Sequence, residues 1–262
     1  MKRQHKQNRK NVLAGLLLII ALGVMAFSGC RLWSIHQMYA QGDHSYEQLA
    51  GLVHRTLPAV SMQKDQTTGP EIPEISVDFA ALQEVNEDGI AWLYNPGTAI
   101  DYPVVRATDY DWYLHHLPDG TYNSNGTLFL DYNNPDDFSG RLNIIYGHHM
   151  KSGKMFGSLM GYKEQEYFQE HPCLYLYTAE QGNFRIELLY GCVIGAGQWR
   201  DRAFMFEGNL DSLLSYASHH TTFQSEAAYT DNDRFLVLST CSYEFDGARY
   251  VVIGKMIPEY SE

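Results

Sequence analysis

The run Val237-Leu238-Ser239-Thr240-Cys241 is apolar over most of its length and ends in a cysteine. A second apolar run begins eight residues later, at Arg249-Tyr250-Val251-Val252. Short apolar runs separated by a polar segment are typical of neighbouring β-strands joined by a loop. This pair therefore predicts two neighbouring strands, with a thiol at the end of the first and a guanidinium at the start of the second.

The chain from Ile90 onward repeats this alternation of short apolar runs and turn signals. The turn signals are Asn95-Pro96-Gly97, Pro118-Asp119-Gly120, Asn123-Ser124-Asn125-Gly126 and Gly182-Asn183. Such spacing favours a closed or nearly closed β-barrel. Two helices are also expected, one over residues 77–86 and one over Asn209–His219. In the second, the apolar residues at helical spacing are Leu210, Leu213, Leu214 and Ala217.

Cys241 is the first candidate for covalent chemistry. Nearby positive charge stabilises a thiolate, which is the nucleophilic form of cysteine. A base is also needed, and His148 follows an apolar run and a glycine in Asn143-Ile144-Ile145-Tyr146-Gly147-His148-His149-Met150. An attacked amide carbonyl becomes an oxyanion. The planar guanidinium of Arg249 could donate hydrogen bonds to this oxyanion, or it could hold a carbonyl group of the substrate.

Each candidate also has a plainer structural interpretation. Cys241 would be an inert core thiol, and Arg249 would be a surface ion-pair residue. His148 would be an ordinary turn histidine, with His149 as the adjacent competitor for the role of base. Two further cations in a polar loop are Arg200 and Arg202.

Three of these segments resemble the active-site signatures of the sortase family, in the same chain order. They are Tyr146-Gly147-His148, Leu238-Ser239-Thr240-Cys241 and Arg249-Tyr250-Val251-Val252. The flanking sequence is most similar to class B sortases. Further blocks that resemble sortases are Ile100-Asp101-Tyr102-Pro103-Val104-Val105, Trp112-Tyr113-Leu114 and Gly126-Thr127-Leu128-Phe129-Leu130-Asp131. Each motif alone is common, but their order and spacing over residues 75–257 make the resemblance specific.

The resemblance implies a mostly β protein, an eight-stranded sortase barrel with N-terminal helices and a helix in the connection before the cysteine strand. It also implies a membrane-anchored cysteine transpeptidase that cleaves a C-terminal sorting motif of surface proteins after Thr. A thioester at Cys241 would then pass the acyl group to an amine of cell-wall peptide or of pilin. His148 would protonate the departing amine and deprotonate the incoming one. No cofactor is implied.

The same resemblance suggests how the peptide would be held. Leu114 and Ser239 would line the peptide groove, Thr240 would offer its backbone near the oxyanion, and residues 195–232 would form one wall. Leu114 has the alternative of being a core leucine of the barrel. The chain departs from the class B pattern at Tyr110, where Asn often follows the Asp, so a side-chain contact is not inherited there.

The N-terminus indicates a membrane anchor. Residues 1–10 carry Lys and Arg but no acid, and residues 13–30 form an uncharged apolar run that Leu32-Trp33 can extend. The positive-inside rule then places the N-terminus in the cytoplasm and residues 34–262 outside. Two alternatives stay open: a cleaved signal peptide, and a lipoprotein signal at Phe27-Ser28-Gly29-Cys30.

The expected organisation therefore has four parts. They are a cytoplasmic basic tail over 1–10, a transmembrane anchor over 11–33, a helical segment and linker over 34–74, and a sortase catalytic domain over 75–262. The linker is expected at Asp65–Pro73, which is rich in turn-forming residues. After residue 33 the chain carries 13 Lys and Arg against 31 Asp and Glu, which argues against nucleic acid as a partner.

Two rival functions use the same residues differently. A secreted Cys-His peptidase would hydrolyse peptides instead of joining them to amines. A surface lipoprotein without catalysis would be modified at Cys30 and would need no reactive thiol at Cys241.

Metal binding is not favoured by the sequence. Doubled histidines at 115–116, 148–149 and 219–220 come without His-x-x-x-His or Cys-x-x-Cys spacing, which argues against zinc. The oxygen-rich run Asp131–Asp137 lacks the spacing and glycine of a calcium loop, so it is expected to be a turn.

One register argument concerns the remaining cysteines. If Gly182-Asn183 forms a two-residue turn, Gln181 faces Phe184, and Cys173 then lies opposite Cys192. A cross-strand disulfide would fit an extracellular domain, and buried free cysteines are the alternative.

Overall fold

The computed structural model describes residues 2–56, 75–199 and 210–259. The expected linker at Asp65–Pro73 and the alternative cations Arg200 and Arg202 lie outside these residues. The chain divides into two compact units, Met1–His44 and Ser45–Glu262.

The first unit consists of most of a long helix, α1 (Lys2–Val53). Among the described residues, this helix contains the one stretch long and apolar enough to cross a membrane, within Gly15–Val53. Its large apolar side chains are exposed over residues 16–33. A signal sequence near an N-terminus passes the same test, so the helix is a candidate membrane span.

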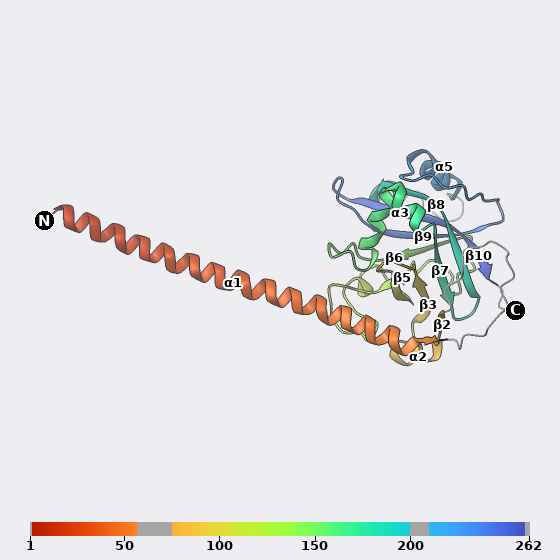
Figure 1. Cartoon of the computed structure of the whole chain (residues 1–262), viewed down its shortest axis with the longest axis horizontal. Coiled ribbons are helices and arrows are strands. Elements are labelled where there is room, and N and C mark those ends of the chain that lie inside the picture. Colours follow the sequence, from red (N-terminus) through yellow and green to blue (C-terminus); the bar gives the residue numbers. More distant parts are fainter. Residues whose placement is uncertain (1, 57–74, 200–209, 260–262) are drawn as a thin grey trace. The chain divides into compact units, whose positions relative to one another are not determined.

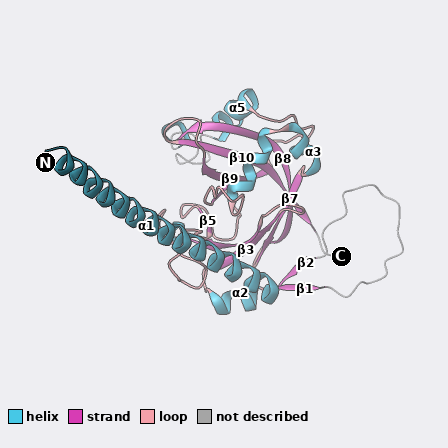
Figure 2. Ribbon diagram, turned by 60° about the vertical axis from the view of Figure 1, so that its left-hand side comes forward, coloured by secondary structure: helices cyan, strands magenta, loops and turns pink. Residues whose placement is uncertain are grey.

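The second unit is built around a closed barrel with the strand order β10-β8-β7-β3-β4-β5-β6-β9 (Figures 1 and 2). The strands are β3 (Gly89–Tyr94), β4 (Asp101–Arg106), β5 (Leu128–Leu130), β6 (Leu142–Tyr146), β7 (Cys173–Thr178), β8 (Gly182–Gly195), β9 (Arg234–Cys241) and β10 (Ala248–Glu259). Two neighbouring pairs, β4–β5 and β6–β9, are parallel, and the other pairs are antiparallel. The eight-stranded barrel predicted from the sequence is therefore confirmed.

Shorter elements cover the barrel. They are β1 (His54–Thr56), β2 (Ile75–Val77), α2 (Phe79–Val85), the 3₁₀ helices η1 (Trp112–Leu114) and η2 (Phe156–Lys163), α3 (Gln165–Glu170), α4 (Ala196–Trp199) and α5 (Leu210–His220). The predicted helices at 77–86 and Asn209–His219 are confirmed as α2 and α5. Asp78 caps α2 by accepting the backbone N–H of Ala81, the usual role of an aspartate at this position.

Residue alternation along β9 separates two hydrophobic clusters. Leu236 and Leu238 point into the barrel core. Phe235 and Val237 point outward and pack in a second cluster with the predicted apolar face of α5, formed by Leu210, Leu213, Leu214 and Ala217. Because side chains alternate along a strand, Cys241 continues the outward series and lies on the face that α5 partly covers.

The hairpin β7–β8 has a different register from the one derived for a two-residue turn. Thr178 pairs with Gly182 across a three-residue loop, and Gly182 has a φ of 80°. A glycine with positive φ closing a three-residue loop is a common hairpin geometry. Cys173 consequently lies opposite Glu187, not Cys192, and both cysteines are free. The register that placed Cys173 opposite Cys192 is therefore wrong, and the alternative of two free cysteines describes this structure.

Candidate active site

Strand pairing places Cys241 and Arg249 side by side. Cys241 is the last residue of β9 and lies directly opposite Arg249 on β10. Directly opposed residues on antiparallel strands share a face, with Cβ atoms roughly 5 Å apart. Both residues are half-buried. The thiol and the guanidinium therefore share the outer face at one end of the barrel.

The end of β6 adds the histidine. Tyr146 pairs with Ser239 of β9, and the Gly147 amide donates to the Ser239 carbonyl at 3.3 Å. The Thr240 hydroxyl in turn donates to the Gly147 carbonyl at 2.8 Å. These contacts bring the backbone immediately before His148 against the last residues of β9. The three predicted catalytic residues thus lie at the ends of three adjacent strands.

The imidazole of His148 is held by a backbone carbonyl. Its Nε2 lies 2.7 Å from the carbonyl oxygen of Leu114, and because a carbonyl only accepts, Nε2 carries the hydrogen. Nδ1 is then the basic nitrogen of the neutral ring. Burial lowers the pKa of His148, the Leu114 carbonyl opposes this shift, and the neighbouring His115 lowers the pKa further. The neutral, proton-accepting form is therefore favoured near neutral pH.

His149, the competing base, contacts the backbone of Cys241. The Nδ1 atom of His149 lies 2.9 Å from the Cys241 carbonyl oxygen, and its ring centroid is 4.9 Å from that of Tyr243. The imidazole thus links the loop after β6 to the loop after β9. These contacts indicate a structural role for His149, which holds the two loops together.

The three residues expected to bind substrate lie in different surroundings. Ser239 is 1% exposed on the outer face, next to Cys241, and its hydroxyl has no hydrogen-bond partner among the described residues. Thr240 faces the barrel interior. Leu114 is half-buried and packs against a cluster around Phe129 that is separate from the barrel core. Its carbonyl, which orients His148, was missed because no residue type marks a backbone acceptor.

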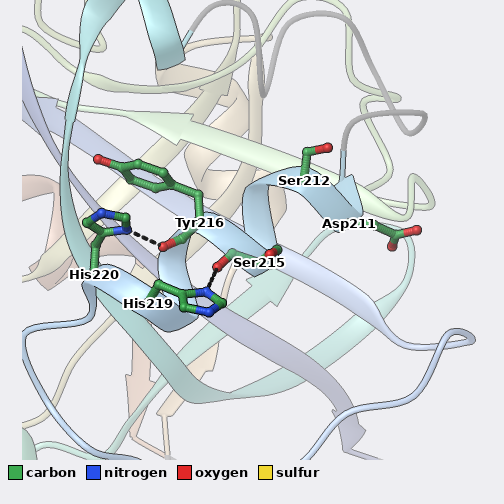
Figure 3. Close-up of a pocket in the computed structure, with 6 residues that line it drawn as sticks. All are labelled: Asp211, Ser212, Ser215, Tyr216, His219 and His220. Atoms are coloured by element: carbon green, nitrogen blue, oxygen red, sulfur yellow. Dashed lines mark hydrogen bonds between the residues drawn. The ribbon is translucent and has the colours of Figure 1, made fainter.

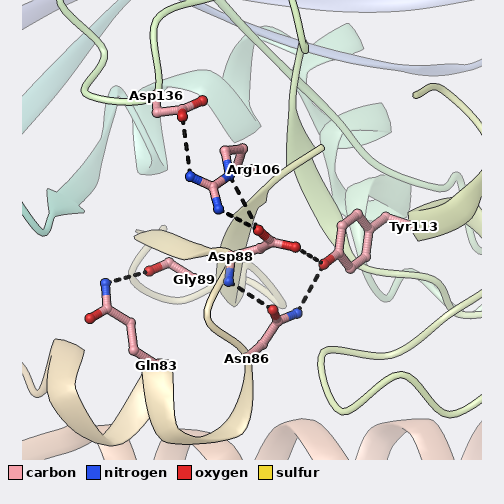
Figure 4. Close-up of polar contacts among 7 residues, drawn as sticks. All are labelled: Gln83, Asn86, Asp88, Gly89, Arg106, Tyr113 and Asp136. Atoms are coloured by element: carbon pink, nitrogen blue, oxygen red, sulfur yellow. Dashed lines mark hydrogen bonds and ion pairs between the residues drawn. The ribbon is translucent and has the colours of Figure 1, made fainter. Parts of the chain in front are cut away.

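The segment that carries this carbonyl is tied to the turn before β3 (Figure 4). The Tyr113 hydroxyl donates to Asp88 at 3.0 Å and accepts from the Asn86 amide at 3.0 Å. Arg106 completes the cluster with a 2.7 Å ion pair to Asp88. Burial raises the pKa of Tyr113 to about 12, so its hydroxyl remains a donor. No motif in the sequence marks this cluster.

Gly126 packs directly against the same segment. Its φ is 60°, and a Cβ atom there would lie 2.7 Å from the Tyr113 carbonyl oxygen and 2.8 Å from that of Leu114. The next amide, of Thr127, donates to the Tyr113 carbonyl at 2.7 Å. Glycine is therefore required here both for the backbone conformation and for the close approach to Leu114.

The remaining polar clusters do not form a metal centre. In the part of the chain that the structure describes, no group of three or more His, Cys, Asp or Glu side chains is arranged to hold an ion. A hollow on α5, shown in Figure 3, is lined by Asp211, Ser212, Ser215, Tyr216, His219 and His220. Its two imidazoles bond backbone carbonyls of their own helix, at 2.7 and 2.8 Å. The 219–220 histidine pair thus serves the end of α5.

The run Asp131–Asp137 forms the turn predicted for it. The Asn134 amide donates to the Asp131 carbonyl at 2.8 Å, and the Asn133 amide donates to the Asp131 carboxylate at 2.9 Å. These are the bonds of an Asx turn. Asp131 is 3% exposed, and its carboxylate accepts hydrogen bonds from within the protein.

Comparison with known proteins agrees with this geometry. No family model matches the chain. Sortase B of Listeria monocytogenes is 29% identical over 258 residues, which are 95% of this chain and 98% of that protein.

Solved structures that resemble this chain are also class B sortases. Sortase B from Bacillus anthracis has a TM-score of 0.69 and 26% identity, over 86% of this chain and 100% of that chain. A Streptococcus pyogenes class B sortase involved in pilus biogenesis has a TM-score of 0.62 and 29% identity, over 69% of this chain and 98% of that chain. The relatives in sequence and in structure thus support the assignment of this chain as a class B sortase, a cysteine transpeptidase.

Proposed function

We propose that the protein cleaves a C-terminal sorting motif of surface proteins after Thr, and transfers the acyl group to an amine of cell-wall peptide or of pilin. The observation that carries this proposal is the placement of Cys241 opposite Arg249, with His148 following the strand on the other side of β9. A nucleophile, a cation and a base on one barrel face are what acyl transfer through a thioester needs.

The first half-reaction forms the thioester. The Cys241 thiol gives its proton to Nδ1 of His148, and the sulfur attacks the carbonyl carbon of the Thr residue. The tetrahedral intermediate then collapses, the C–N bond breaks, and the imidazolium returns the proton to the departing amine. The Nε2–H bond to Leu114 keeps Nδ1 as the nitrogen that exchanges this proton.

The second half-reaction reverses the direction of proton transfer. The incoming amine attacks the thioester carbonyl and gives a proton to neutral His148, and the Cys241 thiolate leaves and is reprotonated. Each tetrahedral intermediate carries an oxyanion, which Arg249 stabilises together with the backbone of Thr240. The lowered pKa of His148 favours this step, because a neutral imidazole must be present to accept the proton.

Substrate would approach along the outer face. Ser239, which lies two residues before Cys241 on the same face of β9, would line the peptide groove together with Leu114. Helix α5 packs against the same face through the cluster that contains Val237 and Val251. It would therefore form part of the wall expected from residues 195–232.

The N-terminal helix would anchor the enzyme. We propose a basic cytoplasmic tail over residues 1–10, a membrane span over 11–33 and a catalytic domain over 75–262 outside the cell. Labelling of Cys241 by a membrane-impermeant maleimide on intact cells tests this orientation. Labelling only after lysis would contradict it, and a lipid-modified mature chain beginning at Cys30 would favour the lipoprotein alternative.

The activity is tested with the full-length protein in detergent micelles. A library of peptides with Thr at a fixed position is mixed with enzyme and either triglycine or a lysine-containing pilin peptide as acceptor. Mass spectrometry should detect a peptide joined to one acceptor and its loss in Cys241→Ala. Release of the acid alone, with acceptors in excess, would instead identify a peptidase.

A further inference from the structure

Asp131 holds a buried carboxylate that the proposed reaction does not use. It is 3% exposed, and its Oδ2 atom accepts from the Tyr146 hydroxyl at 2.9 Å. The Tyr110 hydroxyl donates to the same carboxylate at 3.1 Å. The amide side chain of Asn133 donates to Oδ1 at 2.9 Å. Three side chains thus donate to this one buried carboxylate, which satisfies its hydrogen-bonding capacity within the protein.

The two phenols come from the two segments that together fix the catalytic imidazole. Tyr146 lies two residues before His148, at the end of β6. Tyr110 lies four residues before Leu114, whose carbonyl bonds His148 Nε2. We infer that Asp131 is a positioning residue for His148, because its carboxylate joins the strand that carries the imidazole to the segment that orients it. This inference rests on the role of His148 in the proposed function.

The carboxylate of Asp131 and the two phenols bonded to it form a joint between β6 and the segment before Leu114. The backbone of Asp131 makes this joint rigid. Asp131 directly follows β5, and its amide donates to the Ile144 carbonyl of β6 at 2.8 Å. The preceding residue, Leu130, pairs with Ile145 of the same strand. The carboxylate is therefore fixed to β6 through the main chain, while Tyr110 reaches it from outside the sheet. Loss of the Tyr110 hydroxyl would release the η1 side of this joint and leave the β6 side in place.

Both phenols remain donors under all conditions in which the enzyme would work. Burial and the Asp131 carboxylate raise the pKa of Tyr146 well above its ordinary value. The same two causes raise the pKa of Tyr110.

Nuclear magnetic resonance of the full-length protein in detergent micelles, with ¹⁵N-labelled histidine, tests the inference directly. His148→Gln identifies the His148 signals. The wild type should show His148 protonated at Nε2 and bare at Nδ1. Tyr110→Phe and Asp131→Asn should shift these signals towards a mixture of the two tautomers. A wild-type imidazole protonated at Nδ1, or an unchanged Nε2–H signature in both variants, would overturn the inference.

A matched control separates positioning from general stability. Tyr175→Phe removes another buried phenol hydroxyl, on β7, which is four strands from β6 in either direction around the closed barrel. This variant should leave the tautomer of His148 unchanged even if it lowers the melting temperature. If Tyr175→Phe changes the tautomer as much as Tyr110→Phe, the effect is not specific to Asp131 and the inference fails.

A double variant tests whether the two phenols act through one carboxylate. Tyr110→Phe should lower kcat for acyl transfer by about 10-fold with little change in KM, because a misplaced base slows the chemical step. Tyr110→Phe with Tyr146→Phe should show a non-additive loss, as expected for groups in one network. Strict additivity, or a change in KM alone, would count against a shared joint. Absence of transfer by the wild type would refute the proposed function, and the tautomer experiment would still decide the role of Asp131.

Discussion

The candidate active site combines two regions that are fixed in different ways. The ends of β9 and β10 place Cys241 and Arg249 through backbone pairing, which follows from the register of a closed barrel. The segment around η1 orients His148 through one carbonyl, and that segment is held by a few side-chain contacts and one tight glycine. Strand register is supported by the whole core, whereas a loop contact depends on its own few bonds. The nucleophile should therefore be robust to distant substitution, and the base should be sensitive to it.

The largest effect is expected at the nucleophile itself. Cys241→Ala removes the sulfur that is proposed to form the thioester, so acyl transfer should fall to background while the melting temperature stays within a few degrees. Cys173→Ala is the matched control, since it removes another free, half-buried thiol. Peptide transfer is followed by mass spectrometry. Residual thioester formation in Cys241→Ala would show that another residue is the nucleophile.

The guanidinium opposite the sulfur should come next. Arg249→Lys keeps the charge but loses the planar fork of donors, so kcat should fall by roughly 100- to 1,000-fold, the range for loss of one oxyanion donor. The fold should persist, because Arg249 is only the second residue of the long strand β10, and the pairs farther along this strand are unchanged. Steady-state kinetics with a fixed peptide measures the effect. Full activity in the lysine variant would remove Arg249 from the oxyanion site.

The third effect probes the loop-held region, which is the segment around η1 that orients His148. Gly126→Ala would place a methyl group 2.8 Å from the Leu114 carbonyl oxygen and 2.7 Å from that of Tyr113, so this backbone must move. We expect a fall in kcat of about 10- to 100-fold as His148 loses its acceptor. The backbone strain adds a loss of about 1–2 kcal/mol in unfolding free energy.

Gly120→Ala is the control for Gly126→Ala. It also has a positive φ, 79°, but a Cβ there meets no atom within 4 Å. Its strain should therefore lower stability by a similar amount without lowering kcat. Equal kcat losses in the two variants would show that strain, and not the contact with Leu114, causes the effect.

The features fixed by strand pairing could be predicted from the sequence, and the features fixed by loop contacts could not. The barrel, α5 and the strand ends with Cys241 and Arg249 were predictable, because alternation and helical spacing record which face is buried. The β7–β8 register was not, because a glycine marks a turn without stating how many residues the loop contains. The loop contacts at the site correspond to no recognisable pattern in the sequence. The carbonyl of Leu114 has no residue signature, and Asp131 in an oxygen-rich run indicates a turn and says nothing of two distant phenols.

A pH experiment measures the environment of the loop-held base. Burial lowers the pKa of folded His148 below the unfolded value of 6.5. Between these two pKa values the unfolded chain binds more protons, so stability is complete above pH 6.5 and falls as the pH drops towards the folded pKa. His148→Gln should therefore lose less stability than the wild type between pH 7 and 5, as measured by urea unfolding. Equal losses would show that the imidazole is not desolvated.

The smallest effect should come from the edge of the loop-held region. Tyr113→Phe removes the hydroxyl between Asn86 and Asp88, yet Asp88 keeps its ion pair with Arg106. The buried ring remains in place, so the expected loss is about 1 kcal/mol of unfolding free energy, the usual value for one hydrogen bond. Because η1 is also held by Gly126 and Tyr110, kcat should fall by less than the Gly126→Ala variant shows. A larger loss of kcat in Tyr113→Phe would make the Asp88 cluster the principal support of His148, and the carboxylate of Asp131 a secondary one.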